Sequence, residues 1–263
     1  MIYIGLPVHN EQHTIGLLLW KIRALLTEQG RDFHLLVVDD ASTDDTAEVL
    51  EPYGRVLPLT VLKNQTRLGY AASVEQLIRE AVRRSDYPKR DAVLILQGDF
   101  SEAPEVIPDM VRRFEGGADV VAARTSASRG LPRPVRVARL GGSIVARTLP
   151  IPDQVEDPLC GFRLYRLVAL KRVLALAADG EPLLRHAGWA ANLELLLTVW
   201  PHVRQFEDME VTLDYSRHSR VSRLRAGRQI WDVFRASRDR RLRRLGSRGT
   251  DANERGKQAV AKG

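Results

Sequence analysis

Four acidic side chains stand where apolar runs in the first hundred residues give way to polar sequence: Glu11, Asp39, Asp40 and Asp99. The apolar runs predict buried strands, and the carboxyl ends of parallel strands meet at one edge of a sheet, where ligands bind. Carboxylates gathered there repel each other unless a cation or the N–H donors of a ligand compensate their charge. The pattern therefore indicates a site for a metal–phosphate complex.

The triplet Gln97, Gly98 and Asp99 is central to this pattern because it follows the continuous apolar run 93–96. Glycine allows a ligand to approach the backbone, and a carboxylate beside it suits Mg²⁺ or Mn²⁺. The simpler interpretation is that Asp99 caps the helix that follows. The triplet alone does not decide between the two.

Strands and helices alternate through the first half of the chain. We expect strands at 1–6, 33–38, 57–62, 93–96 and 119–123, with helices after each of the first four. This order predicts an α/β fold with a mainly parallel central sheet and helices on both faces. The carboxyl-end loops of such a sheet would bring the four acids together.

The alternation stops after residue 124. We expect a basic loop at 124–136, a helix at 137–148, a short strand after 157, a helix from 188 to about 200, an edge strand at 206–215 and an arginine-rich helix at 222–245. The helix at 137–148 carries Arg139 and Ser143 four residues apart, on one face. Trp189 and Trp200 are interpreted as core residues.

Composition narrows the class of protein. The chain has 263 residues, 44% of them hydrophobic and 28% charged, which is typical of a globular protein. No secretory leader and no run long enough to span a bilayer is recognised, so we expect a cytoplasmic location. The single cysteine, Cys160, excludes an internal disulfide and a cysteine-built zinc site. No dinucleotide-binding glycine motif, P-loop, serine-nucleophile elbow or H-E-x-x-H pair is found.

Five segments, in this order, resemble family 2 glycosyltransferases of the GT-A fold, and more closely the dolichyl/polyprenyl-phosphate mannose synthase branch. They are the P-x-x-N-E of residues 7–11, the V-V-D-D-x-S-x-D-x-T of residues 37–46, Gln97-Gly98-Asp99 in the position of a D-x-D with Ala103-Pro104-Glu105 after it, the D-x-x-x-G-F-R-x-Y-R of residues 157–166, and Arg217 with Ser222-Arg223-Leu224. The resemblance covers roughly residues 1–225. It implies a Rossmann-like three-layer α/β/α sandwich.

The resemblance also implies an activity: inverting, metal-assisted transfer of a hexose, mannose or glucose, from a GDP- or UDP-linked sugar to polyprenyl or dolichyl phosphate. Residues 1–124 would be the nucleotide-sugar half of a GT-A domain and 125–225 its acceptor half. A cation, Mg²⁺ or Mn²⁺, would neutralise the leaving diphosphate.

Individual roles follow from the same resemblance. Asp99 and Gln97 would hold the metal. Pro7, His9, Glu11, Asp39, Asp40, Gly69, Gln97 and Gly98 would bind the nucleotide sugar. Arg124, Arg139 and Ser143 would bind the acceptor phosphate. Asp99, Asp157, Arg217 and Arg223 would form the catalytic group, the two arginines closing over the diphosphate.

Two alternatives stay open. If the acceptor is a sugar hydroxyl in cell-envelope glycan synthesis, a general base is needed, and Asp157 is the candidate. Gln97 replaces the first acid of D-x-D and brings less charge to a metal, which leaves room for a non-catalytic nucleotide- or lipid-binding relative.

The positive charge is concentrated at the C-terminal end. The whole chain has 40 basic and 33 acidic residues, and residues 217–263 alone hold 15 and 4 of them. Apolar residues among the arginines predict a basic amphipathic helix at 226–245, followed by a disordered tail at 246–263. The helix either packs on the catalytic domain or contacts an anionic membrane surface, which would make the protein peripheral on the inner membrane face; both can hold together. No nucleic-acid-binding module is recognised, so no nucleic acid is expected as a partner.

Overall fold

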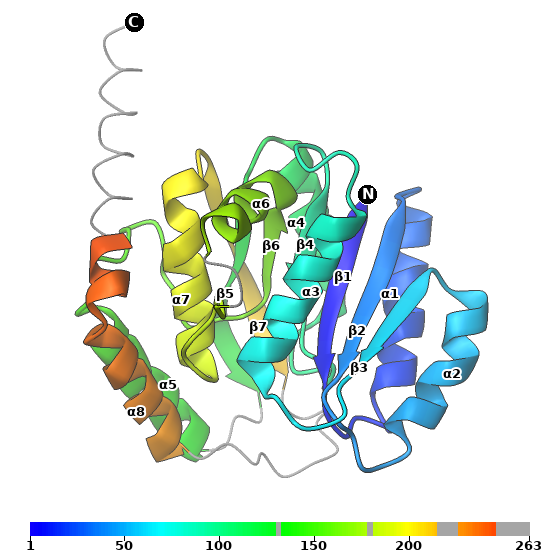
Figure 1. The fold of residues 1–263 in the computed structure, drawn as a ribbon, viewed down its shortest axis with the longest axis horizontal. Coiled ribbons are helices and arrows are strands. Elements are labelled where there is room, and N and C mark those ends of the chain that lie inside the picture. Colours follow the sequence, from blue (N-terminus) through cyan, green and yellow to red (C-terminus); the bar gives the residue numbers. More distant parts are fainter. Residues whose placement is uncertain (130–132, 178–180, 215–225, 246–263) are drawn as a thin grey trace, which may run out of the picture.

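The computed structural model describes residues 1–129, 133–177, 181–214 and 226–245 (Figure 1). A central sheet lies between two layers of helices, so the predicted three-layer α/β/α sandwich is confirmed. The first half contains β1 (Ile2–Val8), α1 (Ile15–Glu28), β2 (Phe33–Asp39), α2 (Thr46–Val56), β3 (Leu59–Lys63), α3 (Tyr70–Arg84), β4 (Ala92–Ile95), η1 (Pro104–Val106) and α4 (Ile107–Glu115). The second half contains β5 (Val120–Arg129), α5 (Arg133–Ala146), β6 (Arg163–Arg166), α6 (Leu167–Leu176), α7 (Trp189–Val199), η2 (Trp200–His202), β7 (Phe206–Asp214) and α8 (Ala226–Ser237).

The described sheet has seven strands in the order β3-β2-β1-β4-β6-β5-β7. β1 pairs in parallel with both β2 and β4, and β2 pairs in parallel with β3. β6 runs antiparallel between β4 and β5, and β7 closes the sheet parallel to β5. The sheet is therefore mainly parallel, and the predicted strand at 206–215 is an edge strand as expected. Its parallel arrangement places the carboxyl ends of β1, β2 and β4 side by side.

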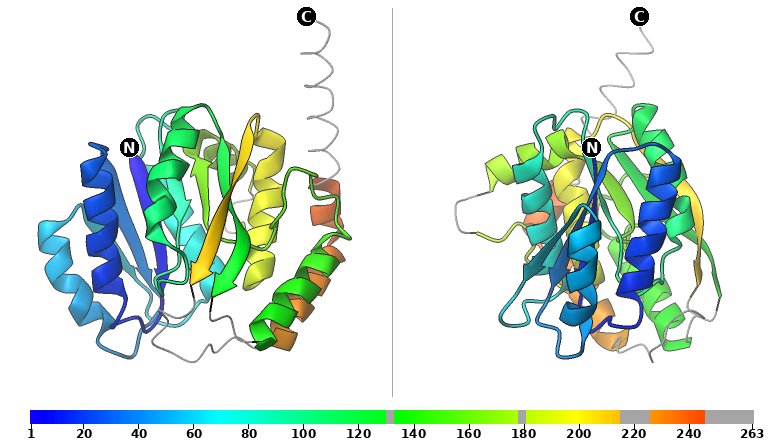
Figure 2. Two further views of the ribbon diagram at one scale, coloured as in Figure 1. Left: turned by 180° about the vertical axis from the view of Figure 1, so that it is seen from behind. Right: turned by 90° about the vertical axis from the view of Figure 1, so that its right-hand side faces the viewer.

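Each face of the sheet is covered by three helices with apolar faces. α1, α2 and α4 pack on one face around residues such as Ile4 and Leu94, which have no exposed surface. α3, α6 and α7 pack on the other face around Leu36 and Val93. A third apolar cluster joins α5, α7, α8 and the helical turns at 240–245. Through this cluster, α5 and α8 pack at one side of the sandwich (Figure 2).

Two expected elements differ in the structure. The segment 124–136 is not one loop, because β5 continues to Arg129 through its ladder with β7 and α5 already begins at Arg133. The C-terminal helix is interrupted at 238–239, where Asp239 Oδ1 accepts a hydrogen bond from the backbone N–H of Arg241 and starts a new helical segment at 240–245. The predicted catalytic residues Arg217 and Arg223 and the tail 246–263 lie outside the described residues. Within the described part of the chain, no helix has the length and hydrophobicity needed to cross a bilayer.

Candidate active site

The loops that follow β1 and β2 are bonded to each other. His9 Nδ1 lies 2.9 Å from the carbonyl oxygen of Asp40, and the backbone N–H of Asn10 donates to Ser42 Oγ over 2.8 Å. The backbone N–H of Glu11 donates to Thr46 Oγ1 over 2.8 Å. The P-x-x-N-E and V-V-D-D-x-S-x-D-x-T segments, about thirty residues apart in the sequence, therefore form one structural unit.

Asp40 anchors the loop that precedes α3. Its buried carboxylate accepts hydrogen bonds from Asn64 Nδ2 and from the backbone N–H groups of Leu68 and Gly69, over 2.8–3.0 Å. Asp39 accepts one from the backbone N–H of Ser42. The expected repulsion among the acids is thus relieved at these two positions by N–H donors of the chain itself.

The triplet after β4 packs against the β1 loop. A Cβ on Gly98 would lie 2.9 Å from Val8 Cγ2, so only glycine fits there without displacement. Thr14 Oγ1 lies 3.0 Å from the carbonyl oxygen of Gly98 and 2.9 Å from Glu11 Oε2. Asp99 Oδ1 accepts from both the backbone N–H and the hydroxyl of Ser101. These contacts bring Glu11, Gly98 and Asp99 together as predicted.

Among the described residues, three other than glycine adopt left-handed backbone conformations, and each follows one of these strands. Asn10, Ala41 and Phe100 have φ values of 59°, 54° and 60°. For a residue such as Ala41 this conformation costs roughly 1–2 kcal/mol. Backbone strain of this kind concentrates at functional sites because the surrounding contacts must enforce it. The strain marks the same sheet edge as the acids.

A small cavity connects this edge to the second half of the chain. Its lining includes Gln97 and Glu102 on one side and Arg139 and Trp189 on the other. Glu102 is buried and accepts the backbone N–H of Gln97 over 2.9 Å. Burial raises the pKa of its carboxyl to about 8, with a further rise from Asp99 and an opposing effect of Arg139. Nothing in the local sequence pattern distinguishes Glu102 from a solvated turn residue, so the sequence does not predict it as part of the site.

The predicted acceptor-binding arginines are held by two consecutive acids. Arg139 Nη2 lies 2.5 Å from Asp157 Oδ2, and Arg124 Nη1 lies 2.6 Å from Glu156 Oε2. Asp208 and Glu210 also surround Arg124. Ser143 lies one turn after Arg139 on α5. Arg124 of β5 and Arg139 of α5 therefore both contact the loop that contains Glu156 and Asp157.

Trp189 packs against the third apolar cluster, as expected of a core residue, but it is only partly buried. It also lines the cavity, where its ring centroid lies 5.9 Å from Arg139 Cζ. Arg163 of the G-F-R segment is completely buried and donates to the carbonyl oxygens of Asn192 and Asp157. It therefore ties the Asp157 loop to α7. Trp200 is buried, as predicted.

The donor atoms near Asp99 suit a hard divalent cation. They are the Asp99 carboxylate and the side-chain carbonyl of Gln97, at the carboxyl edge of the sheet. No group of three or more His, Cys, Asp or Glu side chains forms a complete cage among the described residues. Mg²⁺ commonly takes only one or two protein carboxylates and completes its shell with water and substrate phosphates. The residues fit a cation that binds together with a diphosphate.

The fold and this strand-end site define a GT-A glycosyltransferase architecture. Residues 3–174 match the family model for Glycosyl transferase family 2, which covers more than half of the sequence. The chain belongs to that family.

Similar proteins of known name support the assignment. An undecaprenyl-phosphate 4-deoxy-4-formamido-L-arabinose transferase of Edwardsiella ictaluri is 28% identical over 65% of this chain and 50% of the relative. A dolichol-phosphate mannosyltransferase of Pyrococcus furiosus is 24% identical over 73% of this chain and 51% of the relative. The chain thus spans about half the length of these relatives.

Among solved structures, glucosyl-3-phosphoglycerate synthase of Mycobacterium tuberculosis, in complex with Mn²⁺, UDP-glucose and phosphoglyceric acid, superposes with a TM-score of 0.62. It is 18% identical, and the match covers 90% of this chain and 79% of that one. The likeness shows the fold.

Proposed function

We propose that this chain transfers a hexose, mannose or glucose, with inversion from a nucleotide-diphosphate sugar to a polyprenyl phosphate, assisted by Mg²⁺ or Mn²⁺. The observation that carries the proposal is the cavity shared by Gln97 and Arg139. The cavity lies between the strand-end edge at Gln97, which suits a metal–diphosphate, and the guanidinium of Arg139, which suits a second phosphate. Glu102 lines the same cavity and accepts the backbone N–H of Gln97.

The acceptor side favours an anionic group. Arg139 and Arg124 each hold a carboxylate, and a phosphate can replace a carboxylate as the partner of a guanidinium. A phosphate oxygen is already anionic at neutral pH and needs no strong general base. The names of the two relatives, which refer to undecaprenyl phosphate and dolichol phosphate, support the same acceptor class.

On the donor side, the chain's residues would bind and orient the nucleotide sugar. The bonded loops carrying His9, Glu11 and Asp40 would line the nucleotide pocket, and Asp99, oriented by Ser101, would be the main protein ligand of the cation. When bound, the cation supplies Lewis-acid stabilisation of the leaving diphosphate. The fold neighbour's Mn²⁺ and UDP-glucose support this arrangement.

Transfer to a sugar hydroxyl is the competing reaction. It would need Asp157 as a base, but the Asp157 carboxylate already contacts Arg139 and accepts the backbone N–H of Cys160. These two contacts occupy both carboxylate oxygens, so a sugar hydroxyl would have to displace Arg139 or the Cys160 N–H to reach either of them. We therefore rank the hydroxyl acceptor second.

The deciding experiment is a transfer assay. GDP-mannose and UDP-glucose would each be offered with undecaprenyl phosphate or with an oligosaccharide that presents sugar hydroxyls, in Mn²⁺ and in EDTA. Metal-dependent glycolipid formation with one donor is the expected result. Product from the oligosaccharide alone would favour transfer to a sugar hydroxyl. Nucleotide binding without either product would favour a non-catalytic relative.

We also propose a membrane-facing surface on α5 and α8, which lie side by side (Figure 1). The outward side of α5 exposes Val137, Leu140 and Ile144, each by more than 60%, and α8 exposes Trp231 by 58%. The inward residues of α8, such as Val233, are buried in the third apolar cluster. Exposed arginines on both helices surround this apolar surface: Arg133, Arg136, Arg228 and Arg235. Such a surface suits an anionic membrane at the inner, cytoplasmic face, where polyprenyl phosphate would be met.

Vesicle sedimentation tests this surface. With anionic phosphatidylglycerol vesicles, L140E and I144E together should weaken binding at least about 10-fold, because charges replace inserted apolar groups. V56E, at a residue 70% exposed on the distant helix α2, is the matched control. Equal binding by the wild type, the double variant and the control would contradict the proposed surface.

A further inference from the structure

The start of α7 is held by a side chain from α8. Gln229 Oε1 accepts the backbone N–H of Trp189, the first residue of α7, over 3.0 Å. Gly188 has a φ of 55°, and a Cβ there would lie only 2.3 Å from Gln229 Oε1. The glycine thus permits the close approach of Gln229. Gln229 acts as a helix cap supplied from a distant part of the chain.

Trp189 connects this cap to the acceptor side of the cavity. The guanidinium of Arg139 lies over its ring at 5.9 Å, within the range of a cation–π contact. The same guanidinium pairs with Asp157. The direction of the Arg139 side chain therefore depends in part on an indole whose backbone is held by Gln229.

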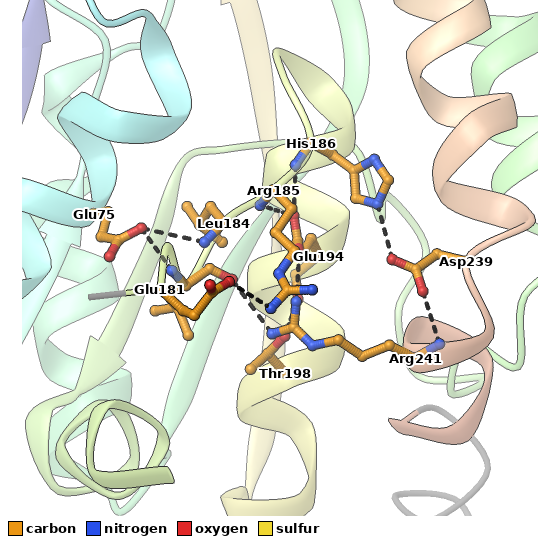
Figure 3. A network of polar contacts seen from close by, with 10 residues as sticks. Glu75, Glu181, Leu184, Arg185, His186, Glu194, Thr198, Asp239 and Arg241 are labelled. Carbon is orange, nitrogen blue, oxygen red and sulfur yellow. Dashed lines mark hydrogen bonds and ion pairs between the residues drawn. The ribbon is translucent and has the colours of Figure 1, made fainter. Parts of the chain in front are cut away.

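The segment leading into Trp189 is fixed by buried carboxylates (Figure 3). Glu75 of α3 accepts the backbone N–H groups of residues 183 and 184, and Glu194 of α7 accepts those of residues 185 and 186. Glu194 has no exposed surface and pairs with Arg241 at 2.9 Å, while His186 contacts Asp239. The C-terminal segment thus holds residues 183–189 at three points, through Gln229, Asp239 and Arg241.

We propose that Gln229 is a positioning residue for the acceptor-phosphate site, acting through Trp189 on Arg139. The inference rests on the proposed acceptor. Gln229 bonds to the start of α7, and its helix α8 packs on α5 and α7. Removing the cap frees the first turn of α7, so Trp189 no longer holds Arg139 in one direction. Acceptor binding should then weaken while donor binding stays the same.

Two substitutions distinguish the effect of the Gln229 hydrogen bond from the effect of the space that its side chain fills. Gln229→Met keeps the length of the side chain and removes the acceptor oxygen, whereas Gln229→Glu keeps an oxygen that a helix N-terminus favours. Lys171→Met, at an exposed position of α6 outside the site and the proposed membrane surface, is the control. Since a cap is worth about 1 kcal/mol, Gln229→Met should raise the KM for undecaprenyl phosphate and the Kd for farnesyl phosphate roughly 5-fold. The donor KM should change less than about 2-fold, and Gln229→Glu should restore wild-type acceptor binding.

Arg139→Ala measured in parallel separates the possible failures. If Arg139→Ala weakens acceptor binding and Gln229→Met does not, the positioning role is wrong and the proposed function stands. Equal changes in donor and acceptor KM would reduce Gln229 to a general structural role and overturn the inference. If the wild type neither transfers to undecaprenyl phosphate nor binds farnesyl phosphate, the proposed acceptor fails and the inference fails with it.

Discussion

The proposed donor and acceptor sites are built by different means. On the proposed donor side, the loops after β1, β2 and β4 are joined by bonds between backbone groups and short polar side chains, as in the contact of Asn10 with Ser42. On the acceptor side, long side chains from separate elements meet, as in the pair of Arg139 with Asp157. The donor side follows from the path of the chain, whereas the acceptor side depends on how α5, α7 and α8 pack.

The difference suits two kinds of substrate. Buried, multiply bonded groups such as Asp40 and the strained backbone at Ala41 would make the proposed donor site preorganised, with little change expected on binding. The acceptor arginines already hold carboxylates that a phosphate can replace. We therefore expect a rigid donor site and an exchangeable acceptor site, and the following experiments test that contrast.

The largest effect is expected at Asp99. Asp99→Ala removes the main oxygen ligand proposed for the cation, and transfer should fall by roughly 1,000-fold or more, since charge on the leaving diphosphate is no longer compensated. Initial rates at saturating Mn²⁺ measure this. Asp153→Ala, at an exposed acid, is the control. Full activity of Asp99→Ala would remove the metal assignment.

Arg139→Ala should act on one substrate only. Loss of a charge-assisted bond of about 1.5–3 kcal/mol predicts a roughly 10- to 100-fold rise in the KM for undecaprenyl phosphate, with the donor KM nearly unchanged. Steady-state kinetics with each substrate varied in turn provide the measurement, and Arg172→Ala, at an exposed position of α6 outside the proposed membrane surface, is the control. Comparable rises in the KM values of donor and acceptor would contradict the proposed difference between the two sites.

Gly98→Ala tests the rigidity of the donor side. The added Cβ would lie 2.9 Å from Val8 Cγ2 and 3.6 Å from the carbonyl oxygen of Pro7, so the free energy of unfolding should fall by about 1–3 kcal/mol. Urea denaturation measures the change. Gly54→Ala, where no atom lies within 4 Å of the new Cβ, should be neutral or stabilising. A Gly98→Ala variant as stable as the wild type would mean that the loops after β1 and β4 can move to accommodate the added Cβ, which would contradict a rigid donor site.

The smallest effect is expected outside both sides, at Glu80 on α3. Hydrogen bonds from Arg83, with a further contribution from Arg84, lower the pKa of its carboxyl from 4.5 to about 2. The lowered value stabilises the fold above pH 4.5, and this contribution is lost as the pH falls through 2. Because both arginines are partly solvated, Glu80→Gln should cost at most about 1 kcal/mol at pH 7. The difference from wild type in urea denaturation should shrink toward pH 2; a constant difference would exclude an ionic origin.

The layered α/β fold and the sheet edge that carries the acids can be predicted from the sequence alone. Alternating apolar runs predict parallel strands, and the polar residues that end those runs must then share an edge, so the positions of Glu11, Asp39, Asp40 and Asp99 follow from the order of the chain alone. The resemblance to family 2 glycosyltransferases added their roles. These features are local, since each depends on a strand and the few residues after it.

The assembly of the proposed acceptor side depends on long-range packing that no local sequence pattern predicts. The burial of Glu102, the exposure of Trp189 to the cavity and the cap from Gln229 each depend on how separate elements pack together. The length of β5 was underestimated for the same reason, because its ladder with β7 carries it to Arg129. Local sequence patterns report which side of an element is apolar, but the partner that a polar side chain meets is set by packing between elements.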